Sequence, residues 1–329
     1  MCYEISLLIV PQHLPAQPII DWECESTYDP ITDPNGTDLV ALSNSKGDAM
    51  VILERGHVTS WRNDRGDELL FTSKKIPKPS NATRGGISVC FPQFCTSTSL
   101  EANSHAKNKG WKIDTDPPPL KQEDYRERSY VDLVLSPSEE DWKDWPYSYE
   151  FRLRVSLSSG GNLNMISRIR NIDSKPFSFS FGYHTYLSVS DICEVRIEGL
   201  ETLDYLDNLS DRKRFTEQGD ALTFESEVNR AYLSSEDCIS VIDHGKKRTI
   251  VIKKKGLPDA VVWNPWQRKS KVKADFGNEE YKKMVCVDGA AIDRPIALKP
   301  GEEWTGCLEL EPVNSSFCSE KFDSHLRNF

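Results

Sequence analysis

The sequence has no long apolar run and no concentration of positive charge. Its 329 residues carry 41 Lys and Arg against 51 Asp and Glu, a net charge of −10, and no basic stripe stands out. This balance argues against a nucleic-acid partner, which needs a local excess of cations. No stretch is long enough to span a membrane. The apolar run at Leu7–Val10 is too short for a signal peptide and has no basic region before it.

Paired cysteine motifs are also missing. The nine cysteines are scattered, odd in number, and never spaced as C-x-x-C. Reduced thiols in a cytoplasmic protein account for this pattern best. We therefore expect neither a disulfide framework nor a cysteine-based metal site.

Several catalytic signatures are absent. We find no G-x-S-x-G elbow, no P-loop, no dinucleotide fingerprint after a strand, and no His/Cys/Asp cluster with metal-ligand spacing. The sequence therefore predicts no metal and no organic cofactor. Helical periodicity is scarce and no internal repeat is visible, which leaves few short helices, among them one expected over 137–145 with Ser138 as its N-cap.

Short strands with turn residues between them are abundant, helped by 18 Gly and 19 Pro. The runs Tyr149–Leu157 and Leu163–Asn171 alternate in polarity and are joined by Ser-Ser-Gly-Gly-Asn, so they predict a hairpin. The pattern is typical of an all-β, mostly antiparallel sandwich. We expect an irregular extension over 1–35, one domain over 36–312 and a polar tail over 313–329. Further strands are expected at the ranges 38–42, 49–53, 57–61, 68–72, 131–135, 177–184, 195–198, 248–253, 260–263, 284–288 and 303–311.

The run Phe177-Ser178-Phe179-Ser180-Phe181-Gly182-Tyr183-His184 is the most informative feature of the chain. Successive side chains of a strand point to opposite faces, so its aromatic residues share one face and its small residues share the other with His184. An aromatic face must be buried. The opposite face predicts the floor of a cleft, although a single histidine is more often structural than catalytic.

Four further residues are candidates for binding or chemistry. Arg84 precedes a double glycine that would let the backbone approach a ligand, or would simply form a tight turn. Asp207 lies in the segment Tyr205-Leu206-Asp207-Asn208-Leu209, where it either binds a ligand or begins a turn. Asp288 ends an apolar strand, so it needs a partner, water, or a role as a base. Trp263 either stacks on a sugar ring or fills the core.

Long segments of the chain resemble the plant-type glucose-6-phosphate 1-epimerases, within the aldose 1-epimerase or galactose mutarotase-like superfamily. The resemblance covers residues 37 to 318. The segments that carry it are RGGISVCFPQF, FGYHTYLSVSDI, GLETLDYLDNL, FTEQGDALTFESEVNRAYL, GLPDAVVWNPW and LKPGEEWTG. It implies a β-supersandwich and a reaction without a cofactor, in which a carboxylate deprotonates the anomeric hydroxyl while a histidine protonates the ring oxygen. It places the acid at His184, the base at Asp288, and substrate contacts at Asp207 and Arg84.

The chain departs from the family pattern at the segment that binds the substrate. The resemblance places Asn103 where a substrate-contacting histidine is expected, and Lys107 where an arginine holds phosphate. His105 would share the face of Asn103 on a strand and could compensate for it. Lysine binds phosphate as a point charge, without the two-pronged fork of arginine. At Asp288 the family has glutamate, whose carboxylate reaches about 1.5 Å further.

Three functions stay open on this evidence. The first is an isomerase that interconverts the α and β anomers of a hexose 6-phosphate by acid–base catalysis. The second is a repurposed relative that isomerises, epimerises or cyclises another cyclic small molecule with the same two groups. The third is a non-catalytic sugar-binding protein. In each case we expect a small-molecule partner, a monomer or weak dimer, and His184 and Asp288 facing each other over an open cleft.

Overall fold

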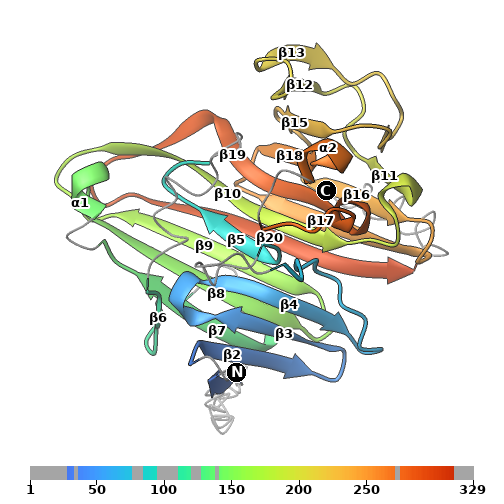
Figure 1. Ribbon diagram of the computed structural model, residues 1–329. Coiled ribbons are helices and arrows are strands. Elements are labelled where there is room, and N and C mark those ends of the chain that lie inside the picture. Colours follow the sequence, from blue (N-terminus) through green and yellow to red (C-terminus); the bar gives the residue numbers. More distant parts are fainter. Residues whose placement is uncertain are drawn as a thin grey trace, which may run out of the picture.

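A computed structural model describes residues 28–32, 36–75, 84–94, 110–119, 127–137, 141–270 and 275–314. Two large sheets dominate it (Figure 1). The first has eleven strands in the order β1-β2-β3-β4-β5-β10-β19-β18-β15-β12-β13, and the second has nine in the order β14-β11-β16-β17-β20-β9-β8-β7-β6. All of the pairings between these strands are antiparallel. The expected all-β, mostly antiparallel architecture is confirmed.

The strands of the larger sheet are β1 Tyr28–Thr32, β2 Asp38–Asn44, β3 Gly47–Ile52, β4 His57–Asn63, β5 Ile87–Cys90, β10 Phe177–Ser188, β12 Asp204–Asp207, β13 Lys213–Thr216, β15 Val228–Tyr232, β18 Asp259–Asn264 and β19 Met284–Leu298. Those of the smaller sheet are β6 Lys112–Ile113, β7 Glu127–Leu135, β8 Tyr149–Ser158, β9 Leu163–Asn171, β11 Val195–Glu198, β14 Leu222–Thr223, β16 Cys238–Asp243, β17 Arg248–Lys255 and β20 Glu303–Asn314. The helical pieces are α1 Asp141–Asp144, α2 Trp266–Ser270 and the short 3₁₀ turns Leu53–Arg55, Ile192–Glu194 and Glu280–Lys283. None of the described helices is long and apolar enough to cross a membrane.

The core lies between the two sheets and is rich in aromatic rings. Phe91, which follows β5, meets Tyr149 and Phe151 of β8 and Phe179 of β10 edge to face, at centroid distances of 5.1 to 5.4 Å. Each ring of this size buries about 150–250 Å². At about 25 cal/mol per Å², that burial is worth roughly 4–6 kcal/mol per ring before entropy is subtracted.

Strand β10 shows the alternation that the sequence predicts. Phe177, Phe179, Phe181 and Tyr183 are buried in the core. The hydroxyl of Tyr183 reaches the second sheet, 2.7 Å from Ser167 Oγ. Because one face of β10 is committed to the core, His184 lies on the opposite face.

Four local expectations need correction. Asp288, which was expected to end a strand over 284–288, lies inside β19, which continues to Leu298. Tyr28–Thr32 forms strand β1 inside the range expected to be irregular, and Pro30 is tolerated there because β1 is an edge strand. Residues 68–72 form only isolated bridges, since this segment bonds partly to β4 and partly to β10. The expected helix over 137–145 is reduced to α1, and its proposed cap Ser138 lies outside the described residues. The predicted hairpin is confirmed as β8 and β9.

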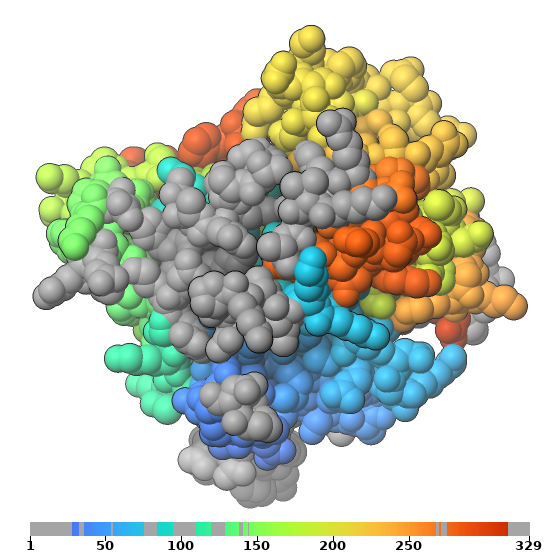
Figure 2. Space-filling model, in the orientation of Figure 1, coloured from blue at the N-terminus to red at the C-terminus, as the bar shows by residue number. Residues whose placement is uncertain are grey.

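The larger sheet runs the length of the molecule. Strand β2 lies near the bottom of Figure 1, and β12 and β13 form its top, which projects in the space-filling view (Figure 2). Strands β10 and β19 pair in the middle of this sheet. The candidate site lies on the face of β10 and β19 that is turned away from the core.

Candidate active site

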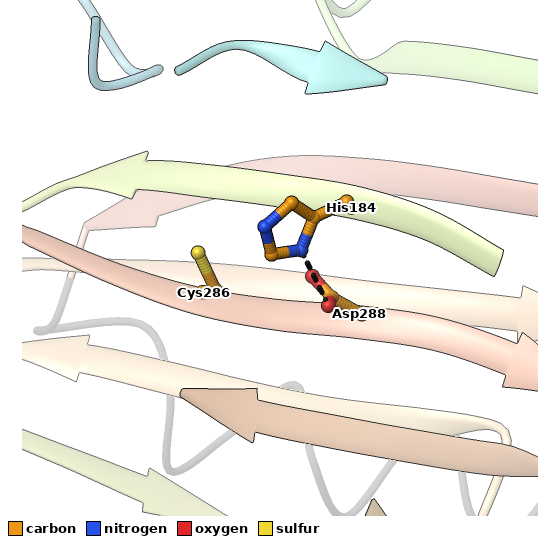
Figure 3. Close-up of side chains that lie close together, drawn as sticks. All are labelled: His184, Cys286 and Asp288. Carbon is orange, nitrogen blue, oxygen red and sulfur yellow. Dashed lines mark hydrogen bonds and ion pairs between the residues drawn. The ribbon is translucent and has the colours of Figure 1, made fainter. Parts of the chain in front are cut away.

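His184 and Asp288 come from adjacent strands and lie opposite each other. The pairs Tyr183 with Gly289 and Tyr186 with Cys286 fix the register of β10 against β19, which sets His184 against Asp288. Residues two apart on a strand share a face, so Tyr186 and Cys286 join them. Figure 3 shows His184, Cys286 and Asp288 gathered on one side of these two strands.

The imidazole and the carboxylate are in direct contact. His184 Nδ1 lies 2.8 Å from Asp288 Oδ2, and the Thr185 amide donates to Asp288 Oδ1 at 2.8 Å. The two residues are only 5% and 1% exposed. The sequence led us to expect the two groups separated across an open cleft. They share one face as expected, but they form a buried hydrogen-bonded pair.

Tyr186 and Arg84 extend this pair on the side away from Asp288. The Tyr186 hydroxyl lies 3.0 Å from His184 Nε2, and Arg84 Nη1 donates to the same hydroxyl at 2.9 Å. Arg84 also donates through Nε to Asp275 Oδ2 at 2.7 Å, and its Nη2 lies 2.6 Å from the same oxygen. A continuous chain of hydrogen bonds therefore runs from Asp275 to Asp288.

Burial and charge act on this chain together. Burial disfavours the charged form of Arg84, but the interactions with Tyr186 and Asp275 outweigh it and raise the pKa of Arg84. Burial also raises the pKa of the Tyr186 phenol, and the nearby Arg84 opposes this rise only in part. At neutral pH, Arg84 is therefore a cation and Tyr186 a neutral phenol.

Trp263 lies beside this group. It pairs across β18 and β19 with Cys286. Its ring centroid is 6.1 Å from those of His184 and Tyr186. Because Trp263 is 7% exposed and belongs to the main core cluster, it packs the wall of the site. Its stacking on a sugar ring stays a prediction.

Cys286 adds a sulfur to the same face. One donor atom each of His184, Cys286 and Asp288 lies within 4.8 Å of the others, which is the kind of set that can hold a soft divalent cation such as Zn²⁺. His184 and Asp288 already satisfy each other by a hydrogen bond. That the chemistry needs no metal stays a prediction.

The double glycine after Arg84 serves the fold. A Cβ at Gly85 would lie 2.3 Å from the Phe71 carbonyl oxygen, and one at Gly86 would lie 2.2 Å from that of Val58. These glycines therefore let neighbouring strands approach each other. The sequence left open whether these glycines approach a ligand or serve the fold alone, and the space beside both is filled by the chain itself.

Asp207 caps a turn, which is the simpler of its two readings. Its carboxylate accepts from the Leu209 amide at 2.8 Å and from the Ser210 hydroxyl at 3.0 Å. The register pairs the neighbouring Leu206 with Ala231, and Ala231 with Val261 beside Asp288. By alternation, Asp207 points away from that side of the sheet. Its contact with a substrate stays a prediction, as do those of Asn103, His105 and Lys107, which lie outside the described residues.

Sequence reasoning missed Tyr186 and Asp275. The signal for Tyr186 was available, because it lies two residues after His184 on the same strand and so shares its face. Asp275 had no comparable signal, since it is 191 positions from the arginine that it binds.

Comparison with known proteins identifies the family. Residues 38–311 match the family model described as "Aldose 1-epimerase". The chain belongs to the aldose 1-epimerase family. A protein of Cenchrus ciliaris named "Putative glucose-6-phosphate 1-epimerase" is 55% identical over 297 residues, which is 89% of this chain and 90% of that protein. A protein of the same name from Escherichia coli is 27% identical, with 77% of this chain and 83% of that protein covered.

Solved structures described as mutarotases or mutarotase-like proteins share the fold. A crystal structure described as "a putative mutarotase (YeaD) from Salmonella typhimurium" superposes with a TM-score of 0.75 at 23% identity, covering 87% of this chain and 94% of that one. A "galactose mutarotase-like protein" from Clostridium acetobutylicum gives a TM-score of 0.66 at 15% identity, with 88% and 99% covered. At this level of identity the likeness establishes the galactose mutarotase-like fold.

Proposed function

We propose that this aldose 1-epimerase family member interconverts the α and β anomers of a hexose 6-phosphate by proton transfer through His184 and Asp288. The observation that carries the proposal is the direct contact of the two groups, with Nδ1 and Oδ2 2.8 Å apart. In a cyclic hemiacetal, the anomeric hydroxyl and the ring oxygen are bonded to the same carbon. The two oxygens are therefore close together, and a neighbouring acid and base can serve both.

The reaction then needs only these two groups. A substrate hydroxyl takes the place of the imidazole at Asp288, which accepts its proton as base. His184, as the imidazolium, delivers a proton to the ring oxygen, and the ring opens. After rotation about the C1–C2 bond, the ring closes on the other face as His184 takes that proton back and Asp288 returns its proton to the carbonyl oxygen. Such a pose requires each group to lie within about 2.6–3.2 Å of its target.

The choice of a hexose 6-phosphate rests on the relative with 55% identity and on its name. Lys107 is the cation that we propose for the phosphate, because Arg84 already bonds to Asp275 and Tyr186. Asn103, His105 and Asp207 are proposed to contact the sugar hydroxyls, and Trp263 to contact the ring.

An anomer-exchange measurement by NMR on glucose 6-phosphate tests the function. The wild-type chain is expected to exchange the anomers faster than the buffer alone, and faster than it exchanges glucose or galactose. His184→Ala is expected to lose ~10²–10⁴-fold in rate, the range typical of a general acid or base.

His244→Ala is the matched control, because His244 is exposed and lies on a turn. It should retain the wild-type rate, and circular dichroism should show both variants folded. Equal exchange by wild type and His184→Ala, at any substrate concentration, would exclude the proposed catalysis.

One observation favours the second candidate, a repurposed isomerase that acts on a cyclic small molecule other than a sugar phosphate. The Arg84 and Asp275 side chains are only 10% and 15% exposed and neutralise each other. A phosphate would have to compete with this buried carboxylate for the arginine. The same assay separates the candidates, since the second predicts no turnover of hexose phosphate but binding of another ligand. Saturable sugar binding without any exchange would instead indicate the non-catalytic protein.

A further inference from the structure

We propose that Tyr186 is a positioning residue, whose hydroxyl holds the His184 ring in place through both of its protonation states. The inference rests on the proposed function, in which His184 gains and loses a proton. It goes beyond the family resemblance, which assigns no role to Tyr186. Its basis is the direction of each hydrogen bond between Arg84 and Asp288.

When His184 is neutral, only one arrangement of hydrogens fits the site. Arg84 can only donate, so its Nη1 donates to the Tyr186 oxygen across 2.9 Å. At the other end, the Asp288 carboxylate accepts from the Thr185 amide and can only accept from His184 Nδ1. Neutral His184 therefore carries its proton on Nδ1, and Nε2 has a free lone pair. The Tyr186 hydroxyl donates to that lone pair across 3.0 Å.

The same hydroxyl also fits the charged imidazolium. Protonated Nε2 becomes a donor, and the Tyr186 oxygen has a second lone pair to accept from it. Rotation of the O–H bond is then enough to change direction, with no movement of the heavy atoms. Phenylalanine could serve neither state, and an aliphatic hydroxyl at this position would not reach the ring.

The residues around Tyr186 fix the position of its ring and hydroxyl. It is 3% exposed, its ring lies edge-on to His184 at a centroid distance of 4.6 Å, and Phe71 stacks on it at 6.4 Å. Asp275 fixes Arg84 with two contacts, which keeps one lone pair of the Tyr186 oxygen committed to the arginine. The remaining hydrogen-bonding capacity of the hydroxyl is directed to His184.

A spectroscopic experiment tests the arrangement without any turnover. Long-range ¹H–¹⁵N NMR of the full chain, labelled at histidine, reports which ring nitrogen of His184 carries the proton. We expect the Nδ1–H form in the wild type. In Tyr186→Phe, the Nε2 resonance should move downfield toward that of an imine nitrogen without a donor, while Nδ1 stays protonated.

Tyr183→Phe is the matched control. Tyr183 is on the same strand and also buried, but its hydroxyl bonds on the opposite face to Ser167 Oγ and the Gly306 carbonyl. The Tyr183→Phe variant also loses the hydrogen bonds of a buried phenol, and it should leave the His184 resonances unchanged. A neutral Nε2–H tautomer in the wild type, or an unmoved Nε2 resonance in Tyr186→Phe, would overturn the proposal.

Kinetics supply the second readout. If His184 is the acid, loss of its positioning in Tyr186→Phe should lower kcat by ~10–100-fold, the range expected for a misplacement near 1 Å, with KM within about twofold. Tyr183→Phe should retain kcat. A wild type without any anomer exchange contradicts the proposed function alone, because the NMR result stands by itself. Normal kcat in Tyr186→Phe contradicts the positioning role.

Discussion

At the scale of single residues, Asp288 satisfies two donors with one carboxylate. Oδ1 accepts from the Thr185 amide and Oδ2 from His184 Nδ1, both at 2.8 Å, and the group is 1% exposed. If either of its oxygens were replaced by a hydrogen-bond donor, one buried group would lose its partner. The charge and the acceptor capacity of Asp288 are therefore both needed.

Asp288→Asn tests this requirement. The amide keeps the volume but presents an NH₂ group to either Thr185 or His184, which leaves one buried donor unpaired. We expect the free energy of unfolding in urea to fall by about 1–3 kcal/mol. The anomer-exchange rate should fall by ~10²–10⁴-fold, because the base is lost.

Asp204→Asn is its control. Asp204 binds Arg214 and Thr216 near the surface, far from β19 in the strand order. Both its stability and its rate should stay close to those of the wild type. An Asp288→Asn variant with full activity would show that the carboxylate is not the base.

At the scale of elements, the Arg84 segment reaches its place through two glycines. Gly85 and Gly86 have φ values of +132° and +66°, which side-chain-bearing residues rarely adopt. Their hydrogen bonds tie the segment to residues 71–73 and to β10, since Gly86 donates to the Phe71 carbonyl and accepts from Tyr186. The backbone of Gly86 therefore bonds to the same residue whose hydroxyl binds Arg84.

Gly86→Ala should destabilise this junction through two effects. The backbone strain costs about 1–2 kcal/mol, and the new Cβ meets the Val58 oxygen at 2.2 Å. Gly66→Ala isolates the first effect, because Gly66 has a φ of +79° and nothing within 4 Å of its Cβ position. Urea unfolding should show a larger loss for Gly86→Ala than for Gly66→Ala. An equal loss of unfolding free energy in both variants would mean that the sheet accommodates the new Cβ without a further loss of stability.

At the scale of the whole molecule, buried phenols in the two sheets make the stability of the folded chain depend on pH. Tyr149, Tyr183 and Tyr232 are each at most 1% exposed. Burial raises the pKa of all three phenols above their ordinary value of about 10. The folded chain therefore retains protons that the unfolded chain releases above about pH 10.

The sign of the pH dependence follows. A raised folded pKa means that the stabilisation is complete below about pH 10 and is lost as the pH rises above it. Each such tyrosine adds up to ~1.4 kcal/mol of lost stability per pH unit. Urea unfolding between pH 8 and 11, followed with phenolate absorbance, should show ionisation only on unfolding. Tyr183→Phe should make the decline less steep, and an identical slope would contradict the assignment.

The sequence by itself determined the all-β architecture, the β8–β9 hairpin and the face of β10 that carries His184. These follow from side-chain alternation with a period of two and from turn residues, which are local properties. It also determined the family, through segments that keep their residues in order.

The tertiary structure alone decided which groups meet. The register of β10 against β19 brings His184 to Asp288 across 104 positions, and Arg84 reaches Asp275 across 191. In the tertiary structure, His184 and Asp288 form a buried pair where an open cleft was expected. The double glycine allows neighbouring strands to pack closely. Such contacts depend on strand order and sheet packing, and no local pattern in the chain encodes them.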